Sequence, residues 1–488
     1  MGEAKKSRPH PRCREAPAYV RAMLKKGRYD DASLTGWGRL DELLELMIST
    51  GLSGILDEIR VRVDEEAPIP RWFVHSALAL KLVVGERGIA AMQEGMLRDE
   101  GLLRILGCSR KEIEEGFDPA RNKHSNKPCH VDSLRYSLEH TKAEEFEEAL
   151  RKYRRKLWEI RGLKSSTYLL DATKIPLYGD YEGVGTLIRV EGVKQKSGKW
   201  RERKVEEKGF KLVTLNRVVK GQLLVEAVRL IPINQNEIEV SDELIEEILA
   251  ERGEGAIGLL LIDRGFLDGG RLRRWKERGI YTLVPLKQNM AMLKDMEGLV
   301  KISGGVKAER GKDLCVWGYA DLETLDSYGG KLNGLLVTRF RGRELREGQR
   351  WGFATTMPVN TVGQVLRAYD LYDERSLVEN KEYRELKQGW FLRSFSGKKA
   401  SEIAYHTQVS LMLLNLIVIY KLRKGRKDKK VLGKGIRRLR RQELTDGAAV
   451  VVLSGESYAV MKLSEFAALL GRPPTGSTEP QDGQAQEE

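Results

Sequence analysis

The sequence predicts an α/β protein in which a mixed sheet with flanking helices follows a helical N-terminal region. The chain has 488 residues, enough for two or three domains. Residues 38–61, 71–96 and 143–162 have apolar residues at helical spacing, and together they make 1–160 a helical domain. From residue 166, strand-like apolar runs alternate with helical segments, an order typical of a mixed sheet covered by helices.

The elements of the expected sheet follow one another from residue 166 to residue 287. Two strands should be joined by a tight turn at Lys220 and Gly221. A helix should begin with Ser241 as its N-cap and end at Gly253. The expected order is strand 166–178, strands 209–221 and 222–234, helix 241–253, strand 256–266, helix 267–279 and strand 280–287.

The rest of the chain divides by composition. Short strand-like pieces rich in glycine fill 291–365, which predicts a β-rich insertion between 161–290 and 366–422. The apolar run 408–420 is too short for a membrane span and predicts a buried core helix. A basic segment, 423–445, is followed by a small C-terminal piece, 446–470, and a tail, 471–488, whose composition predicts disorder.

The positive charge of the chain is concentrated in one place. The formal net charge is +14, and residues 421–441 hold twelve Lys or Arg and one Asp, which leaves +3 for the remainder. This segment predicts a polyanionic partner, although charge alone specifies neither a fold nor a reaction. A solvated linker is the alternative.

The cysteines and the N-terminus favour a reducing compartment. None of Cys13, Cys108, Cys129 and Cys315 pairs at the spacing of a zinc site or a disulfide framework. No apolar run follows the first residues, so we expect no secretory signal and no membrane segment. The expected location is cytoplasmic, in association with the nucleoid.

Two aspartates end apolar strands. Asp171 lies in YLLDATKIPLYG, and Asp263 follows LLLI and precedes Arg-Gly-Phe. Carboxylates at the carboxyl ends of neighbouring strands lie in the crevice where ligands bind. A close pair repels unless a cation lies between the two groups, and Mg²⁺ prefers oxygen ligands. The pair is therefore a candidate metal site for phosphodiester chemistry, unless each Asp merely starts a turn.

A third candidate element is the helical segment 371–390. Tyr372, Arg375 and Glu379 are spaced so that they share one face of a helix. That face could present a carboxylate beside a cation to the two aspartates. The alternative is a solvated helix with charge pairs such as Arg375 with Glu379.

The three blocks together resemble the signature of insertion-sequence DDE transposases that carry a Tyr-Arg-Glu-Lys motif. In that family the first Asp lies on the first strand of a ribonuclease-H-like sheet, and the second is often followed by Arg-Gly-Phe. The Glu lies in Tyr-x2-Arg-x3-Glu-x6-Lys, after a β-rich insertion. Asp171, Asp263 and Glu379 match the three acidic positions. The family Lys would fall on Leu386, whereas the nearest lysine is Lys387.

The resemblance implies a function. It implies that Asp171, Asp263 and Glu379 are catalytic and bind two Mg²⁺ or Mn²⁺ ions per active site. It implies a DNA transposase that cuts transposon ends and joins them to target DNA by two-metal phosphoryl transfer. The alternatives are a transposase-derived DNA-binding protein without catalysis, and a nuclease of the same fold that cuts but does not join.

Double-stranded DNA, as transposon ends and as target, is the expected partner, bound by a homodimer. Residues 1–160 are expected to recognise the transposon ends, with packing or multimerisation as the alternative. Tyr372, Arg375 and Lys387 should contact DNA near the site. The arginines of RRLRR should add affinity that is independent of DNA sequence. They are Arg437, Arg438, Arg440 and Arg441.

Overall fold

A computed structural model of the chain divides it into two compact units. The first comprises residues 1–141 and 436–488, and the second comprises residues 142–435. The structure describes residues 14–60, 69–118, 127–194, 200–302, 304–311, 313–341, 344–373, 382–453 and 457–470.

The first unit joins both ends of the chain. Its three-stranded sheet has the order β1-β12-β13, so a strand from the N-terminal region pairs with strands from the C-terminal piece. Its elements are α1 (Pro17–Lys25), β1 (Asp31–Thr35), α2 (Leu40–Ser49), α3 (Leu52–Glu58), α4 (Arg71–Val84), α5 (Ala91–Glu94), η1 (Met96–Arg98), α6 (Glu100–Leu106), α7 (Arg110–Glu115), α8 (Val131–Glu139), α16 (Ile436–Leu439), η7 (Arg440–Leu444), β12 (Ala448–Val452), β13 (Tyr458–Lys462) and α17 (Leu463–Leu469).

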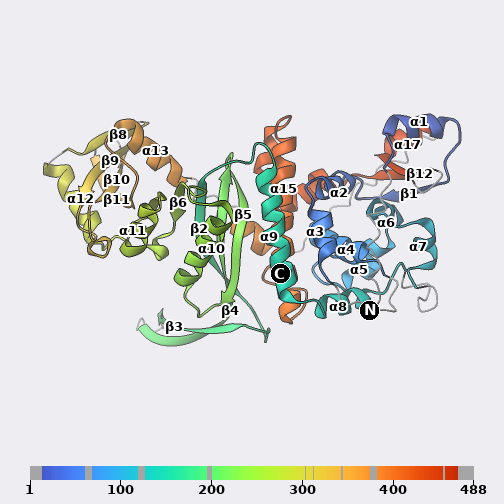
Figure 1. Cartoon of the computed structure of the whole chain (residues 1–488), viewed down its shortest axis with the longest axis horizontal. Coiled ribbons are helices and arrows are strands. Elements are labelled where there is room, and N and C mark those ends of the chain that lie inside the picture. Colours follow the sequence, from blue (N-terminus) through green and yellow to red (C-terminus); the bar gives the residue numbers. More distant parts are fainter. Residues whose placement is uncertain are drawn as a thin grey trace. The chain divides into compact units, whose positions relative to one another are not determined.

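The second unit is built on one large mixed sheet (Figure 1). Its first half is formed by β2 (Thr167–Pro176), β3 (Gly185–Lys194), β4 (Trp200–Val219), β5 (Gln222–Pro232), β6 (Leu259–Ile262) and β7 (Tyr281–Pro285). β4 is antiparallel to β2, β3 and β5, whereas β6 is parallel to both β2 and β7. The order β5-β4-β2-β6-β7, with helices between the strands, confirms the predicted mixed α/β fold.

The expected insertion extends this sheet. β11 pairs with β7, and the strands continue in the order β11-β10-β9-β8. Residues 291–302, within the expected β-rich range, form a helix. The elements are α12 (Ala291–Ile302), β8 (Val306–Arg310), β9 (Leu314–Leu322), η4 (Asp326–Tyr328), β10 (Leu332–Arg341) and β11 (Glu344–Thr355).

The remaining helices of the second unit flank the sheet. They are α9 (Ala143–Glu159), α10 (Glu237–Arg252), η3 (Arg264–Phe266), α11 (Gly269–Glu277), α13 (Val362–Asp373), α14 (Arg384–Gln388), α15 (Ala400–Lys424) and η6 (Lys429–Gly433). In Figure 1, α9 and α15 run side by side next to β5.

Local signals placed most of these elements correctly. Lys220 and Gly221 both have positive φ, as a two-residue hairpin turn between β4 and β5 requires. The expected N-cap of α10 was wrong. Asn236 caps the helix by accepting a hydrogen bond from the Ile238 N–H, and Ser241 lies buried inside the helix. The sequence prediction chose Ser241 because serine is a common N-cap residue. Asparagine is equally common there, so residue type alone does not separate the two positions.

The helix α15 is held to the sheet by a buried amide. β5 has an irregularity opposite Leu215, where the pairing skips Glu226. The side chain of Asn415 accepts from the Val225 N–H at 2.8 Å and donates to the Val225 carbonyl at 2.8 Å, so it satisfies backbone groups beside this bulge. By length and composition α15 could cross a membrane, but its apolar window is entirely buried in the protein, as a core helix would be.

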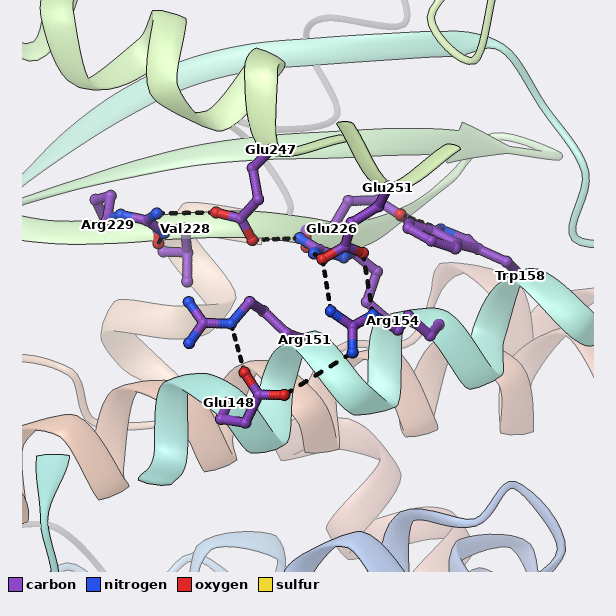
Figure 2. Close-up of polar contacts among 10 residues, drawn as sticks. Glu148, Arg151, Arg154, Trp158, Glu226, Val228, Arg229, Glu247 and Glu251 are labelled. Atoms are coloured by element: carbon purple, nitrogen blue, oxygen red, sulfur yellow. Dashed lines mark hydrogen bonds and ion pairs between the residues drawn. The ribbon is translucent and has the colours of Figure 1, made fainter. Parts of the chain in front are cut away.

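A buried ionic network fastens α9 and α10 to the edge strand β5 (Figure 2). The Arg154 guanidinium donates to the Glu226 carbonyl oxygen at 2.9 Å and to the Glu247 carboxylate at 2.7 Å. Its other amino group reaches Glu251 at 2.5 Å, and the Trp158 indole donates to the Glu226 carboxylate. These partners bind both amino groups of a guanidinium that is almost fully buried, and they connect the two helices to one edge of the sheet.

Candidate active site

The two aspartates lie at adjacent positions of the sheet. The expectation that Asp171 ends its strand was wrong, because β2 continues to Pro176 through its pairing with β4, whereas Asp263 directly follows β6. In the parallel pair β2 and β6, Leu170 is the partner of Ile262, so Asp171 and Asp263 each follow a paired residue. Neighbouring strands lie about 4.8 Å apart, which brings the two residues close together. Positions 92 residues apart in the sequence therefore meet at one point of the sheet, as the sequence predicts.

The two aspartates differ in their surroundings. Asp171 is only 4% exposed, and one of its carboxylate oxygens accepts a hydrogen bond from the Ala172 N–H at 2.7 Å. Asp263 is half-buried and begins the short helix η3, whose Phe266 side chain is anchored in the core. The Asp-Arg-Gly-Phe sequence thus turns the chain sharply after β6 and leaves Arg264 exposed beside the aspartates.

Residues 382–388 form a third element, which lies against β2 and β4. The Tyr383 hydroxyl is 2.9 Å from the Thr214 hydroxyl, and Thr214 is the cross-strand partner of Asp171. The Lys387 ammonium donates to the Thr173 hydroxyl, two residues beyond Asp171. These two contacts bring the start and the end of the segment to the two sides of Asp171.

Glu382 is a buried carboxylic acid of this site that sequence reasoning missed. Its side chain is 4% exposed, and neither of its carboxylate oxygens has a hydrogen-bond partner among the described residues. Burial, followed by the negative charges of Asp171 and Glu385, raises its pKa to about 8. A signal was present in the sequence, because Glu382 is three residues after Glu379 and would share its face on a helix.

Lys387 reaches the site although it departs from the family spacing by one residue. Leu386, at the expected position, is buried in the core with 1% exposure. Residues 382 and 383 have the π-helical conformation, in which a turn holds one extra residue. Burial and nearby Arg393 lower the Lys387 pKa, and Asp171 acts in the opposite direction.

The other residues expected to act from the segment 371–390 are Tyr372, Arg375 and Glu379. Arg375 and Glu379 lie outside the residues that the structure describes. Tyr372 is half-buried on α13, where its ring packs at a tilt against Phe353 of β11 with centroids 4.3 Å apart. The structure therefore gives Tyr372 a packing role, and its expected contact with DNA stays a prediction.

The arginines of RRLRR, in the first unit, do not form one exposed cluster. Arg437, Arg438 and Arg441 are exposed. Arg440 is buried, and its guanidinium donates to the carbonyl oxygens of Leu82 and Val83 at 2.7 and 2.5 Å. The expectation that this whole segment faces solvent or a polyanion was wrong.

The physical reason is a second role for Arg440. α4 ends at Val84, and the last carbonyls of a helix lack partners within the helix. A basic side chain near a helix C-terminus satisfies such groups. Ile436 and Leu439 are buried as well, so the segment alternates between packing and exposure.

The carboxylates suit a hard divalent cation. Mg²⁺ commonly uses one or two protein carboxylates together with substrate phosphate, and Asp171 and Asp263 supply two. The Glu382 oxygens, which lack hydrogen-bond partners among the described residues, add a third acidic group beside Asp171. Among the described residues no three His, Cys, Asp or Glu side chains form a closed metal cluster, and Glu379 is outside that set.

Comparison with known proteins identifies the family of this chain. A family model described as the transposase DDE domain matches residues 162–416. The chain belongs to this transposase family. The matched range contains both aspartates and the segment 382–388. A structure of the piggyBac transposase in a synaptic complex with hairpin DNA is similar to this transposase with 10% identity and a TM-score of 0.39, over 94% of this chain and 83% of that chain. No curated protein matches the chain.

Proposed function

We propose that this transposase cuts the ends of an insertion-sequence element and joins them to target DNA. The adjacency of Asp171 and Asp263 on paired strands of a transposase DDE domain is the observation that supports this proposal. Two close carboxylates repel each other in the absence of a cation, and this makes the site suited to divalent metal binding.

Different residues of the site would have different roles in phosphoryl transfer. Asp171 and Asp263 would hold two Mg²⁺ or Mn²⁺ ions, which when bound supply an activated water and stabilise the leaving oxygen. Lys387 and exposed Arg264 would orient phosphate oxygens. A freed 3′ hydroxyl then attacks the target phosphodiester, so that one P–O bond forms as another breaks.

The third acidic ligand is proposed to be Glu379 or Glu382. Glu379 has the family spacing from Arg375, and Glu382 lies beside Asp171. Glu382 needs no movement of the described backbone to reach this position.

The direct experiment uses DNA taken from both sides of the coding region. Purified full-length protein with Mg²⁺ and labelled fragments should release a 3′ hydroxyl at the element end and then join it to a plasmid target. Cleavage without joining would identify a nuclease instead. Specific binding without either reaction would identify a DNA-binding protein, and both results would overturn the proposal.

Lys387→Met should slow strand cleavage by tenfold or more. The substitution keeps an unbranched side chain but removes a charged donor, and a hydrogen bond to a charged group contributes about 1.5–3 kcal/mol. Cleavage is measured in a single-turnover assay. Lys398→Met, on the loop near Gly179, is the matched control and should cleave at the wild-type rate. Equal cleavage rates for Lys387→Met and Lys398→Met would show that Lys387 does not contribute to cleavage.

Replacing Arg437, Arg438 and Arg441 with Gln should reduce the salt dependence of DNA binding. Each lost phosphate contact changes the slope of log affinity against log salt by about 0.9, so three contacts change it by up to about 2.7. Binding to random DNA and to element ends should weaken alike, because phosphate contacts carry no base information.

Arg440→Gln is the contrasting variant. It should leave the salt slope unchanged but lower the free energy of unfolding by about 2 kcal/mol, because the end of α4 loses its buried donors. A larger loss of DNA affinity in Arg440→Gln than in the triple variant would contradict the assignment of Arg440 to folding and of the other three arginines to DNA binding.

We also propose that the protein acts as a homodimer on double-stranded DNA. Joining two element ends to one target requires two active sites held together. Residues 1–160 are proposed to recognise the element ends. Sedimentation of the protein with and without end DNA measures whether it forms a dimer. Binding of element ends by a chain that lacks this region measures whether the region recognises them.

A further inference from the structure

The second unit has a long two-stranded extension that has no part in the carboxylate site. β4 is twenty residues long, and only its second half, from Gly209, pairs with β2 and β5. Its first half pairs with β3 alone. The two strands form a ribbon of residues 185–194 and 200–209 that extends beyond the body of the sheet, as Figure 1 shows at its lower end.

We propose that this β3–β4 ribbon is a DNA-contacting arm that binds the duplex about ten base pairs from the scissile phosphate. The proposal rests on the proposed function, since it takes the duplex that enters the active site as its occupant. It adds a contact surface outside the carboxylate site.

The base of the ribbon is closely packed. Gly185 and Gly209 are cross-strand partners at the point where β2 gives way to β3. A Cβ on Gly209 would lie 2.3 Å from the Ile175 carbonyl oxygen, and one on Gly185 would lie 2.7 Å from the Pro232 Cβ. Both strands therefore pack too closely at this point to accept a side chain, and glycine is required where the ribbon leaves the sheet.

The arm projects from the side of the sheet that carries the active site. β2 runs from Thr167 through Asp171 towards the ribbon, and the ribbon continues beyond the carboxyl end of β2. Lys204 is ten residues from Thr214, the partner of Asp171, on one unbroken strand. At the rise of an extended strand this is about 33 Å, which equals about ten base pairs of duplex.

The surface of the arm suits a polyanion. Arg201 and Arg203 lie on one face of β4 and Lys204 lies on the other, together with Glu202 and Glu206, and all three basic residues are exposed. Among the side chains that the structure describes, Arg201 and Lys204 have no acidic partner. Nearer the base, Arg189 pairs with Glu207, and Lys208 pairs with Asp180 at 3.1 Å. The basic groups without such pairs therefore lie towards the outer end.

The shape and the apolar residues also fit a nucleic acid groove. A two-stranded ribbon is narrow enough to enter the major groove of duplex DNA. Ile188 and Val190 are 66% and 58% exposed, and Val190 is the cross-strand partner of Lys204. Apolar side chains beside a lysine can contact thymine methyl groups and a phosphate together.

The test uses the Asp171→Asn protein, which is expected to bind DNA without cutting it. In this background, Arg201→Gln, Arg203→Gln and Lys204→Gln are combined, and affinity for an end-containing duplex is measured from 50 to 300 mM salt. The combined variant should bind at least tenfold more weakly at about 0.1 M salt, with a slope reduced by up to about 2.7. Ethylation interference should be lost at phosphates about ten base pairs from the scissile phosphate.

The matched control removes the opposite charge from the same strand. Glu202→Gln with Glu206→Gln should bind equally or more tightly, because both residues are exposed on the ribbon. Equal affinities for all three proteins would overturn the proposal. The proposed function is tested separately, by strand cleavage in the protein that retains Asp171. A shift from dimer to monomer with unchanged DNA affinity would also overturn it and identify a second copy of the chain as the occupant.

Discussion

Asp171→Asn and Asp263→Asn should each abolish detectable strand cleavage while DNA binding is retained. An amide has nearly the shape of a carboxylate but lacks the charge that holds a divalent cation. Metal ions contribute several kcal/mol to the transition state of phosphoryl transfer, which corresponds to about a thousandfold or more in rate. Both variants should fail equally, because the two carboxylates lie at adjacent positions of paired strands.

The measurement is single-turnover cleavage of a labelled element end with Mg²⁺, together with DNA affinity and thermal unfolding of each variant. Asp180→Asn is the control, since Asp180 lies exposed on the loop after the same strand β2. It should cleave at the wild-type rate. A wild-type rate for either Asp171→Asn or Asp263→Asn would show that the two-metal mechanism is wrong.

Much of the catalytic sheet was predictable because its signals are local. The aspartates that follow apolar runs, the Lys220-Gly221 turn and the runs themselves each depend on a few neighbouring residues. The pairing of β1 with β12 was not predictable in this way. These strands are over 400 residues apart in sequence, and nothing in either five-residue segment specifies the other.

The candidate site was predicted in part for a similar reason. Spacing within one helix favours residues on a common face, and it selected Glu379. Finding Glu382 required knowledge of which side chain burial brings to Asp171. Arg440 was misjudged because composition does not reveal that one arginine of a basic run caps a buried helix end.

The second large effect concerns the stability of the metal-free protein. Glu382 has an ordinary pKa of 4.5, and burial with the neighbouring Asp171 and Glu385 charges raises it to about 8 in the folded state. The folded protein thus keeps a proton that the unfolded chain has lost. Between pH 5.5 and pH 8.5 the wild type should therefore lose about 3 kcal/mol of folding free energy through this group.

Glu382→Gln should remove this loss, because the amide stays neutral at every pH. Denaturant unfolding of both proteins across this pH range measures the difference between them, which should grow as pH rises. Asp171→Asn should reduce the difference, since one of the charges that raises the Glu382 pKa is removed. A difference between wild type and Glu382→Gln that does not change with pH would contradict the placement of Glu382 beside Asp171.

Cleavage by Glu379→Gln and by Glu382→Gln then decides which carboxylate completes the site. If Glu382 is the third ligand, Glu382→Gln should lose about a thousandfold in rate, as the aspartate variants do, whereas Glu379→Gln should stay close to wild type. The reverse pattern would assign the role to Glu379 and leave Glu382 as a buried acid beside the metals. Glu385→Gln is the matched control, because Glu385 lies on the same helix α14 and only half-buried. Wild-type cleavage by both Glu379→Gln and Glu382→Gln would mean that Asp171 and Asp263 act without a third carboxylate from this segment.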